Sequence, residues 1–128
     1  MEIKDTPDSI FFTQSIPYDW VLPKATAVIH HGGAGTTHLG VKYACPSLIF
    51  PHIIDQYFWN NTLSNLGIGP KGIPGRKIST DKILPLIKDL WTNKVYRVNA
   101  KRIGEQLQKE DFESELIELL ERPISALA

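Results

Sequence analysis

The sequence predicts an α/β domain built on a parallel sheet, with helices at its C-terminal end. Two short, continuous apolar runs, at 27–31 and 47–51, are typical of strands that are covered on both faces. Each run precedes a segment whose apolar residues have helical spacing, and this alternation is the pattern of parallel sheets. The last third of the chain shows helical spacing only. With 128 residues, we expect one domain over residues 1–128.

Prolines and glycines separate the expected elements. Three β-rich runs predict strands at Ile10–Thr13, Ala27–His31 and Ser47–Pro51. Apolar residues three and four apart predict helices at Thr36–Ala44, Asp55–Leu66, Val95–Lys109 and Phe112–Leu120. A further helix is expected to start at the cap Ser79–Asp81, with its apolar stripe at Ile83, Leu84, Ile87, Leu90 and Trp91.

The composition excludes several classes of protein. Lys plus Arg and Asp plus Glu each number 14, so the formal charge is zero and no strong field attracts nucleic acid. No apolar run approaches the ~20 residues of a membrane-spanning helix. Cys45 is the only cysteine, which precludes an internal disulfide and favours a reducing compartment. We therefore predict a cytoplasmic protein, with peripheral contact to a membrane left open.

The most informative segment runs from His30 to Thr37 and reads His-His-Gly-Gly-Ala-Gly-Thr-Thr. It follows a predicted buried strand, and ligands of parallel α/β sheets bind beyond the carboxyl ends of the strands. Glycines let backbone N–H groups approach an anion closely, and the next helix directs its positive end to the same place. The segment therefore suits a phosphate or diphosphate. Spacing alone favours this interpretation no more than a plain chain reversal.

Two known phosphate-binding fingerprints do not fit this segment. In the dinucleotide pattern G-x-G-x-x-G, Gly33 and Gly35 match, but His38 stands at the third glycine. In the mononucleotide pattern G-x-x-x-x-G-K-[ST], Gly35 and Gly40 match, but Val41 replaces the lysine. Binding of NAD and hydrolysis of ATP are therefore disfavoured.

A second polar cluster follows the strand at 47–51 and should lie at the same edge of the sheet. Asp55 and Gln56 offer the acceptors and donors that sugar hydroxyls need, although an aspartate at a helix start is more often a cap. The four histidines match no standard zinc spacing, so we predict no metal site. Cys45 has no obvious activating base and is interpreted as a packing residue.

Several separated motifs, taken in order, carry a family resemblance. They are Ile16–Trp20, His30–Thr37, Pro46, Pro51, Asp55–Gln56 with Phe58–Trp59, and Gly67–Pro70. Together they resemble the UDP-glycosyltransferases, and most closely the sterol 3-β-glucosyltransferases and their bacterial antibiotic-glycosylating relatives. The resemblance extends from Asp8 to Arg122 and so covers nearly all of the chain.

The resemblance implies the C-terminal, nucleotide-sugar-binding part of a GT-B enzyme, in which two Rossmann-like domains face each other across a cleft. It implies a UDP-sugar donor, with no cofactor and no metal, and an acceptor hydroxyl of a sterol or lipid that attacks C1 of glucose with inversion. The binding residues that it carries over are Ile16 at the uracil, through backbone; His31, Gly33, Gly35, Thr36 and Thr37 at the diphosphate; and Asp55 and Gln56 at the hexose. The family's catalytic base lies in the acceptor domain, so no catalytic residue is assigned here.

The length departs from the family pattern. In the family's strand order 3-2-1-4-5-6, Ile10–Thr13 would be the third strand and Ala27–His31 the fourth, so the first two strands are missing. We expect a partial Rossmann-like parallel sheet with a bare edge on Ala27–His31. We therefore expect a fragment, a truncated gene product or half of a split enzyme. A separate acceptor-binding domain or chain, or self-association through that edge, would be its partner.

Three positions near the predicted hexose site also depart from the pattern. Ile54 stands where relatives carry a small residue, and His52 and Ile53 stand where they often carry two phenylalanines. A bulky residue before the Asp–Gln pair narrows the space for a sugar, so these positions bear on which sugar is held.

Two other functions stay open at this point. A non-catalytic module could keep the fold for protein contacts alone, and the turn could hold another nucleotide or a phosphosugar. Saturable binding of UDP would favour the glycosyltransferase interpretation. Because the acceptor domain is absent, the isolated chain is expected not to glucosylate a sterol.

Overall fold

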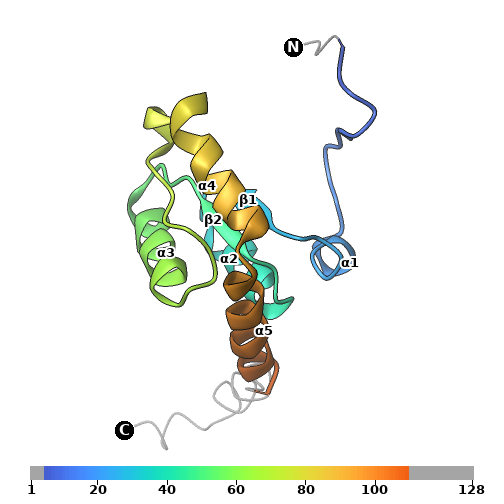
Figure 1. Ribbon diagram of the computed structural model, residues 1–128. Helices are drawn as coiled ribbons and strands as arrows, with labels where there is room; N and C mark the ends of the chain where they lie inside the picture. Colours follow the sequence, from blue (N-terminus) through green and yellow to red (C-terminus); the bar gives the residue numbers. More distant parts are fainter. Residues whose placement is uncertain (1–4, 110–128) are drawn as a thin grey trace, which may run out of the picture.

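The computed structural model describes residues 5–109 as a mixed α/β fold (Figure 1). In chain order the elements are α1 (Tyr18–Val21), β1 (Val28–His30), α2 (Ala34–Lys42), β2 (Ser47–Ile49), α3 (Ile54–Asn65), the 3-10 turn η1 (Gly75–Lys77), α4 (Thr80–Thr92) and α5 (Lys94–Lys109). The predicted helix Phe112–Leu120 lies outside the described residues. None of the helices within residues 5–109 has both the length and the apolar character to cross a bilayer.

The two strands pair in parallel, as the apolar runs predict. Val28, Ile29 and His30 lie opposite Ser47, Leu48 and Ile49 in the register. All three residues of β2 are buried, whereas Ile29 of β1 is 45% exposed. Within the described residues β1 pairs with β2 alone, so its other edge is open. This agrees with the partial sheet expected from the missing strands.

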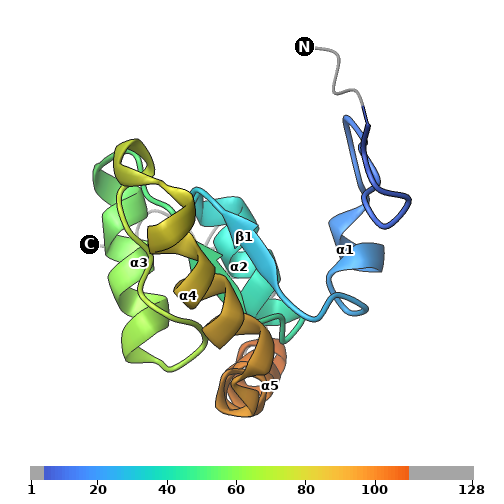
Figure 2. The same ribbon diagram turned by 45° about the horizontal axis from the view of Figure 1, so that its top comes forward.

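Two hydrophobic cores lie on opposite faces of the strand pair. Leu48 and Ile49 point to opposite faces because successive side chains alternate along a strand. On one face Ile49 packs with residues of α2, α3, α5 and the loop after α3: Val41, Leu63, Ala100 and Ile68. On the other face Leu48 and Phe50 pack against one side of α4: Ile83, Leu86, Ile87 and Leu90. Figures 1 and 2 show α4 crossing the side of the strands opposite α2.

The stripe that α4 buries differs in part from the predicted one. Leu84 and Trp91 are 56% and 69% exposed, and Leu86 packs against the core instead. The predicted and the buried apolar residues lie on one broad surface of the helix, because both follow spacings of three and four. The position of β2 determines which of them are buried. Pro85 lies inside α4 and is exposed, on the side away from the core.

The segment after α3 lies directly on the backbone of β2. A methyl group at Gly69 would lie 1.8 Å from the Ser47 carbonyl oxygen, and one at Gly72 would lie 1.6 Å from that of Ile49. The buried Asn60 side chain holds this segment in place: its Nδ2 donates to the Gly72 carbonyl, and its Oδ1 accepts from the Gly72 N–H, both at 2.9 Å. The loop therefore covers the edge of β2 that pairs with no strand within residues 5–109.

Arg97 fastens α5 to the segments that enter the two strands. Its guanidinium donates to the carbonyls of Ala25 (2.8 Å), Thr26 (3.0 Å) and Ala44 (3.0 Å). A planar guanidinium presents five N–H donors in a rigid fork, so it can reach several carbonyls at once. The C-terminal helices are thereby anchored to the sheet.

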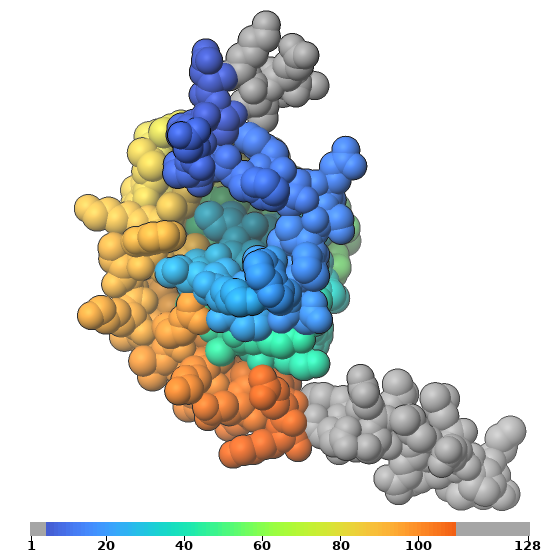
Figure 3. Space-filling model, turned by 90° about the vertical axis from the view of Figure 1, so that its right-hand side faces the viewer, coloured from blue at the N-terminus to red at the C-terminus, as the bar shows by residue number. Residues whose placement is uncertain are grey.

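The segment before β1 forms an arm that stands apart from the strands (Figure 2). The predicted strand Ile10–Thr13 is wrong: these residues form no strand, and Ile10, Phe11 and Phe12 are 52%, 88% and 59% exposed. A strand requires a ladder partner, and the described residues offer none near the arm. Figure 3 shows the surface hollowed between the arm and α4, on the side of β1.

Candidate functional site

The glycine-rich turn and the start of α3 meet at the carboxyl ends of the two strands. Gly32 has a φ of +97°, and a methyl group there would lie 2.7 Å from Ile49 Cγ2 and 3.3 Å from the Gln56 carbonyl oxygen. Only glycine accepts both this φ and this close approach. The turn after β1 and the turn after β2 are therefore in contact, as expected for turns that follow neighbouring parallel strands.

Two histidine rings shape the glycine-rich turn. His30 Nδ1 accepts the N–H of Gly32 at 3.0 Å, and His31 Nδ1 accepts the N–H of Gly33 at 3.1 Å. A methyl group on Gly33 would lie 2.8 Å from the His31 ring, so a larger residue there would displace this ring from the turn. Because Nδ1 of His31 is an acceptor, the proton of the neutral ring is on Nε2, which is left to donate to a ligand. His31 is exposed at the mouth of the turn.

The amides that open α2 are free of side-chain caps. Its N-cap is Gly33, which has no side chain, and the first backbone N–H bonded within the helix is that of Thr37, to the Gly33 carbonyl. Within residues 5–109 the N–H groups of Ala34, Gly35 and Thr36 have no acceptor. A methyl group on Gly35 would meet nothing within 4 Å. Uncapped amides and the helix dipole facing open space form a site for an anion.

The two threonines differ in position. Thr36 is half-buried at the first turn of α2, and its own backbone N–H is one of the open amides. Thr37 is 1% exposed, and its hydroxyl is buried with no hydrogen-bond partner among the described residues. The structure therefore places Thr36, rather than the Thr37 side chain, at the mouth of the turn.

Asp55 and Gln56 occupy the first turn of α3, next to Gly32. The Gln56 side chain is 8% exposed, and its Oε1 accepts the N–H groups of His52 (2.8 Å) and Ile53 (3.2 Å). Gln56 thus closes the turn before α3, and its Nε2 is the part left for a ligand. Asp55 is exposed and is not the cap, because the N-cap position is Ile53. Ile54, which also bears on the space for a sugar, is 92% exposed.

Ile16, the remaining predicted residue, lies in the arm and is 38% exposed. Beside it, the Thr13 hydroxyl donates to the Ser15 carbonyl at 2.7 Å, which shapes the backbone there. No hydrogen bond within residues 5–109 joins this part of the arm to the glycine-rich turn. Seven of the eight predicted residues are thus gathered at the sheet edge, and Ile16 lies in a separate segment, the arm before β1.

Two residues at this edge were not predicted as site residues from the sequence. Tyr57 on α3 and Arg76 on η1 flank the turn before α3, and they are close only because the segment 68–76 folds back along β2. No spacing in the sequence connects them. Within residues 5–109 no cluster of three His, Cys, Asp or Glu side chains could hold a metal ion.

His30 should make the fold acid-sensitive. Burial, with a smaller contribution from the charge of His31, lowers the pKa of His30 from 6.5 to about 4. Between these two values the unfolded chain takes up a proton that the native chain does not, so stability is lost as the pH falls from 6.5 towards 4. The loss should reach about 3 kcal/mol.

Replacing His30 with asparagine isolates this effect, because the amide oxygen can still accept the Gly32 N–H but does not titrate. The free energy of unfolding should be measured in urea at several pH values. As the pH falls from 6.5 towards 4, the natural chain should lose more of this free energy than the His30→Asn variant does. A difference that does not change with pH would contradict the assignment.

Comparison with known proteins agrees with this geometry. Residues 1–122 match the model of the family described as "Erythromycin biosynthesis protein CIII-like, C-terminal domain". The chain is 35% identical over 107 residues to sterol 3-beta-glucosyltransferase UGT80B1 of Arabidopsis thaliana, covering 84% of this chain and 17% of that protein. It is 34% identical over 116 residues to the sterol 3-beta-glucosyltransferase of Komagataella phaffii, covering 91% of this chain and 9% of that protein.

Solved structures share the fold. The spinosyn rhamnosyltransferase SpnG superposes with a TM-score of 0.82 at 20% identity, over 94% of this chain and 32% of that one. The spinosyn forosaminyltransferase SpnP superposes with a TM-score of 0.79, also at 20% identity, over 95% of this chain and 34% of that one. The chain therefore spans about a third of these glycosyltransferases, and less than a fifth of the curated relatives named above. From its sequence match and its fold, the chain belongs to the EryCIII-like C-terminal domain family of GT-B glycosyltransferases.

Proposed function

We propose that the chain holds the UDP-sugar donor of a glycosyltransferase, with the diphosphate at the start of α2. The observation that carries this proposal is the set of uncapped amides of Ala34, Gly35 and Thr36, which open onto unobstructed space at the sheet edge. His31 Nε2 adds a donor beside them, and Asp55 and Gln56 adjoin for the hexose. In this arrangement the uracil lies towards the arm that holds Ile16, and Figure 3 shows the surface hollowed between this arm and α4.

The same groups would assist the reaction. When an acceptor hydroxyl attacks C1 of the sugar with inversion, the C1–O bond breaks and negative charge grows on the departing diphosphate. Fixed N–H donors and a helix dipole stabilise such charge without reorganising during the reaction. The described residues therefore act on the leaving group, and the base that takes the acceptor's proton belongs to a separate acceptor domain.

The named relatives suggest the substrates. Those at 34–35% identity are sterol 3-beta-glucosyltransferases, so UDP-glucose and a sterol or similar lipid hydroxyl are the proposed pair. The 128 residues span about a third of the glycosyltransferases that share their fold, so on their own they are expected to bind the donor but not to turn it over. The proposed location is the cytoplasm, with contact to membranes through the acceptor side.

A second function is favoured by the arm and the open edge of β1. Exposed Phe11, Phe12 and Ile29, together with unpaired strand groups, are the features of a protein-binding surface. An interaction module that keeps the fold without binding a nucleotide would use these features, and the amides at the start of α2 would bind no ligand. The two functions differ in whether UDP binds.

Calorimetric titration of the 128-residue chain with UDP separates them. We expect saturable binding that weakens about tenfold or more in His31→Ala, because a hydrogen bond to a charged phosphate is lost. Thr36→Ala should weaken binding less, and Lys101→Ala, on the exposed surface of α5, should leave it unchanged. TDP and GDP should compete more weakly than UDP. A folded chain that does not bind millimolar UDP would refute the proposal and favour the interaction module.

A further inference from the structure

Two buried polar atoms beside the proposed diphosphate site have no hydrogen-bond partner within residues 5–109. They are Nε2 of the His30 ring and the hydroxyl oxygen of Thr37, whose side chain is 1% exposed. Burial lowers the pKa of His30 to about 4, so the ring is neutral at neutral pH. Because His30 Nδ1 accepts the Gly32 N–H at 3.0 Å, the ring proton is on Nε2. The ring therefore presents a buried donor, and the hydroxyl can accept.

The strand register directs the His30 side chain towards α2. His30 lies opposite Ile49 in the parallel pair, and residues paired in this way share a face of the sheet. Ile49 packs with Val41 of α2, so this is the face that α2 covers. Within α2 the buried residues are Thr37, Gly40 and Val41, whose spacing of three and four places them on one side of the helix. His30 and Thr37 therefore project into the same layer.

The two side chains also lie at the same level along the strands. A methyl group on Gly40 would lie 3.2 Å from the Ser47 hydroxyl oxygen and 3.8 Å from Val28 Cγ1, so Gly40 lies over the first residues of both strands. Helix α2 starts at the carboxyl ends of the strands and runs back along them. Thr37, about one turn before Gly40, is thus displaced in the same direction as His30, which is two residues after Val28.

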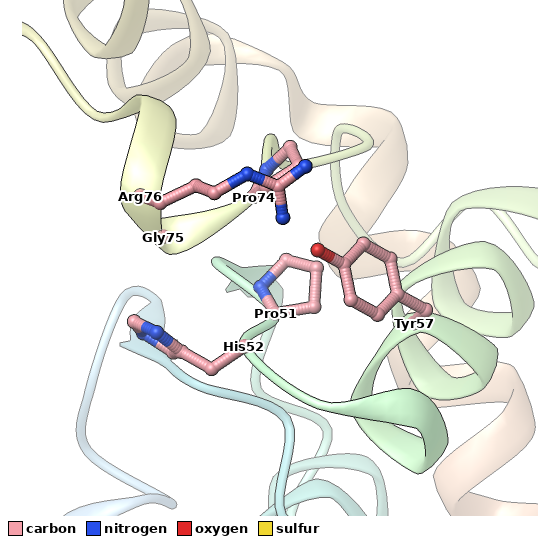
Figure 4. A pocket seen from close by; sticks show the side chains of 6 residues that line it. All are labelled: Pro51, His52, Tyr57, Pro74, Gly75 and Arg76. Atoms are coloured by element: carbon pink, nitrogen blue, oxygen red, sulfur yellow. The ribbon is translucent and has the colours of Figure 1, made fainter.

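The other polar side chains at this edge are directed elsewhere. Arg76 and His52 line a separate hollow, shown in Figure 4, whose lining residues do not include His30 or Thr37. His31 is exposed at the mouth of the turn, and its Nδ1 already accepts a backbone N–H. A buried polar atom without a partner costs free energy, whereas one water between the donor and the hydroxyl would satisfy both.

We propose that His30 Nε2 and the Thr37 hydroxyl are joined through one buried water, and that this link positions the α2 amides for the diphosphate. The water accepts from Nε2–H and donates to the Thr37 oxygen. His30 then holds the Gly32 N–H with one ring nitrogen and the first turn of α2 with the other. The uncapped amides of residues 34–36 lie between these two points, so the link fixes their direction. The inference rests on the proposed UDP site and assigns two positioning residues to it.

Thr37→Val tests the link, because valine keeps the shape of threonine and removes the hydroxyl. If the hydroxyl had no partner, its loss would leave the fold as stable as before or more stable, since an unsatisfied buried group is removed. We expect the opposite: a lower urea midpoint of unfolding, and UDP binding that is weakened about threefold or more.

Two further variants serve as controls for the UDP titration. Thr37→Ser keeps the hydroxyl and should bind UDP within about twofold of the natural chain. Thr92→Val makes the same change at the exposed end of α4, where the hydroxyl donates to the Lys88 carbonyl at 2.7 Å. This variant should leave UDP binding unchanged.

NMR of the histidine rings observes the link without a ligand. The His30 ring should show an Nε2–H proton that exchanges slowly and has a nuclear Overhauser effect to a bound water; its absence from His30→Asn assigns it. Thr37→Val should make this proton exchange much faster, and Thr37→Ser should preserve it. An Nε2–H signal that is the same in the natural chain and in Thr37→Val would refute the link.

The outcomes distinguish this inference from the proposed function. If UDP binds to Thr37→Val as tightly as to the natural chain, the positioning role is wrong and the UDP site stands. If the natural chain does not bind UDP, the proposed function fails and the positioning role fails with it. The histidine spectra then still decide whether the link between His30 and Thr37 exists.

Discussion

Replacing Gly72 with alanine is expected to abolish the native fold. The added methyl group would lie 1.6 Å from the Ile49 carbonyl oxygen, which is part of the buried strand β2 and cannot move aside. Relieving this overlap would displace the segment after α3 and break both hydrogen bonds between Asn60 and Gly72. We expect a loss of at least about 4 kcal/mol, which is a large part of the stability of a small domain.

Far-ultraviolet circular dichroism and urea unfolding measure this effect. Gly35→Ala is the matched control, since the same methyl group meets nothing within 4 Å there. It should fold and should be up to about 1 kcal/mol more stable, because alanine is the better residue inside a helix. A Gly72→Ala chain with the natural unfolding midpoint would mean that the loop does not lie on β2 as described.

The second large effect concerns the same Gly35→Ala variant and its ligand. The open space above Gly35 is where the diphosphate is placed, and the side chain of a helical residue leans towards the helix N-terminus. A methyl group should therefore obstruct the anion and weaken UDP binding about tenfold or more, while stability is kept or raised. If Gly35→Ala binds UDP more weakly although its fold is at least as stable, the loss of binding cannot be explained by damage to the fold.

Calorimetry with UDP on the natural chain and on Gly35→Ala gives this comparison directly. Lys82→Ala, at an exposed position in the first turn of α4, serves as a control for handling and concentration. Equal affinity in the natural chain and in Gly35→Ala would show that the anion does not approach the helix over this residue.

Much of the fold follows from the sequence because burial leaves a simple pattern. Strand β2 is buried on both faces, so its run is continuously apolar, and the prolines and glycines around the two strands limit their length. Helix α3 agrees with its predicted bounds to within one residue at either end, and α5 begins within one residue of its predicted start. The turns at His31 and Gln56 were also predicted to be neighbours, because both follow the carboxyl ends of parallel strands, and the structure places them in contact.

What could not be predicted depends on neighbours in space. Ile10–Thr13 has the composition of a strand, but a strand exists only with a partner, and none of the described residues supplies one. The burial of the Thr37 side chain and the use of Gln56 Oε1 as a turn acceptor depend on how α2 and α3 pack. Arg76 reaches the site only because the glycines at 69 and 72 let the chain lie on β2.

The most direct test of the account follows the backbone amides of α2 by ¹⁵N–¹H NMR during a titration with UDP. If the diphosphate is bound at the helix start, the resonances of Ala34, Gly35 and Thr36 should shift together and saturate, and those of exposed residues on α5 should stay in place. Amides of α2 that remain unmoved at millimolar UDP, or shifts confined to other parts of the chain, would contradict it.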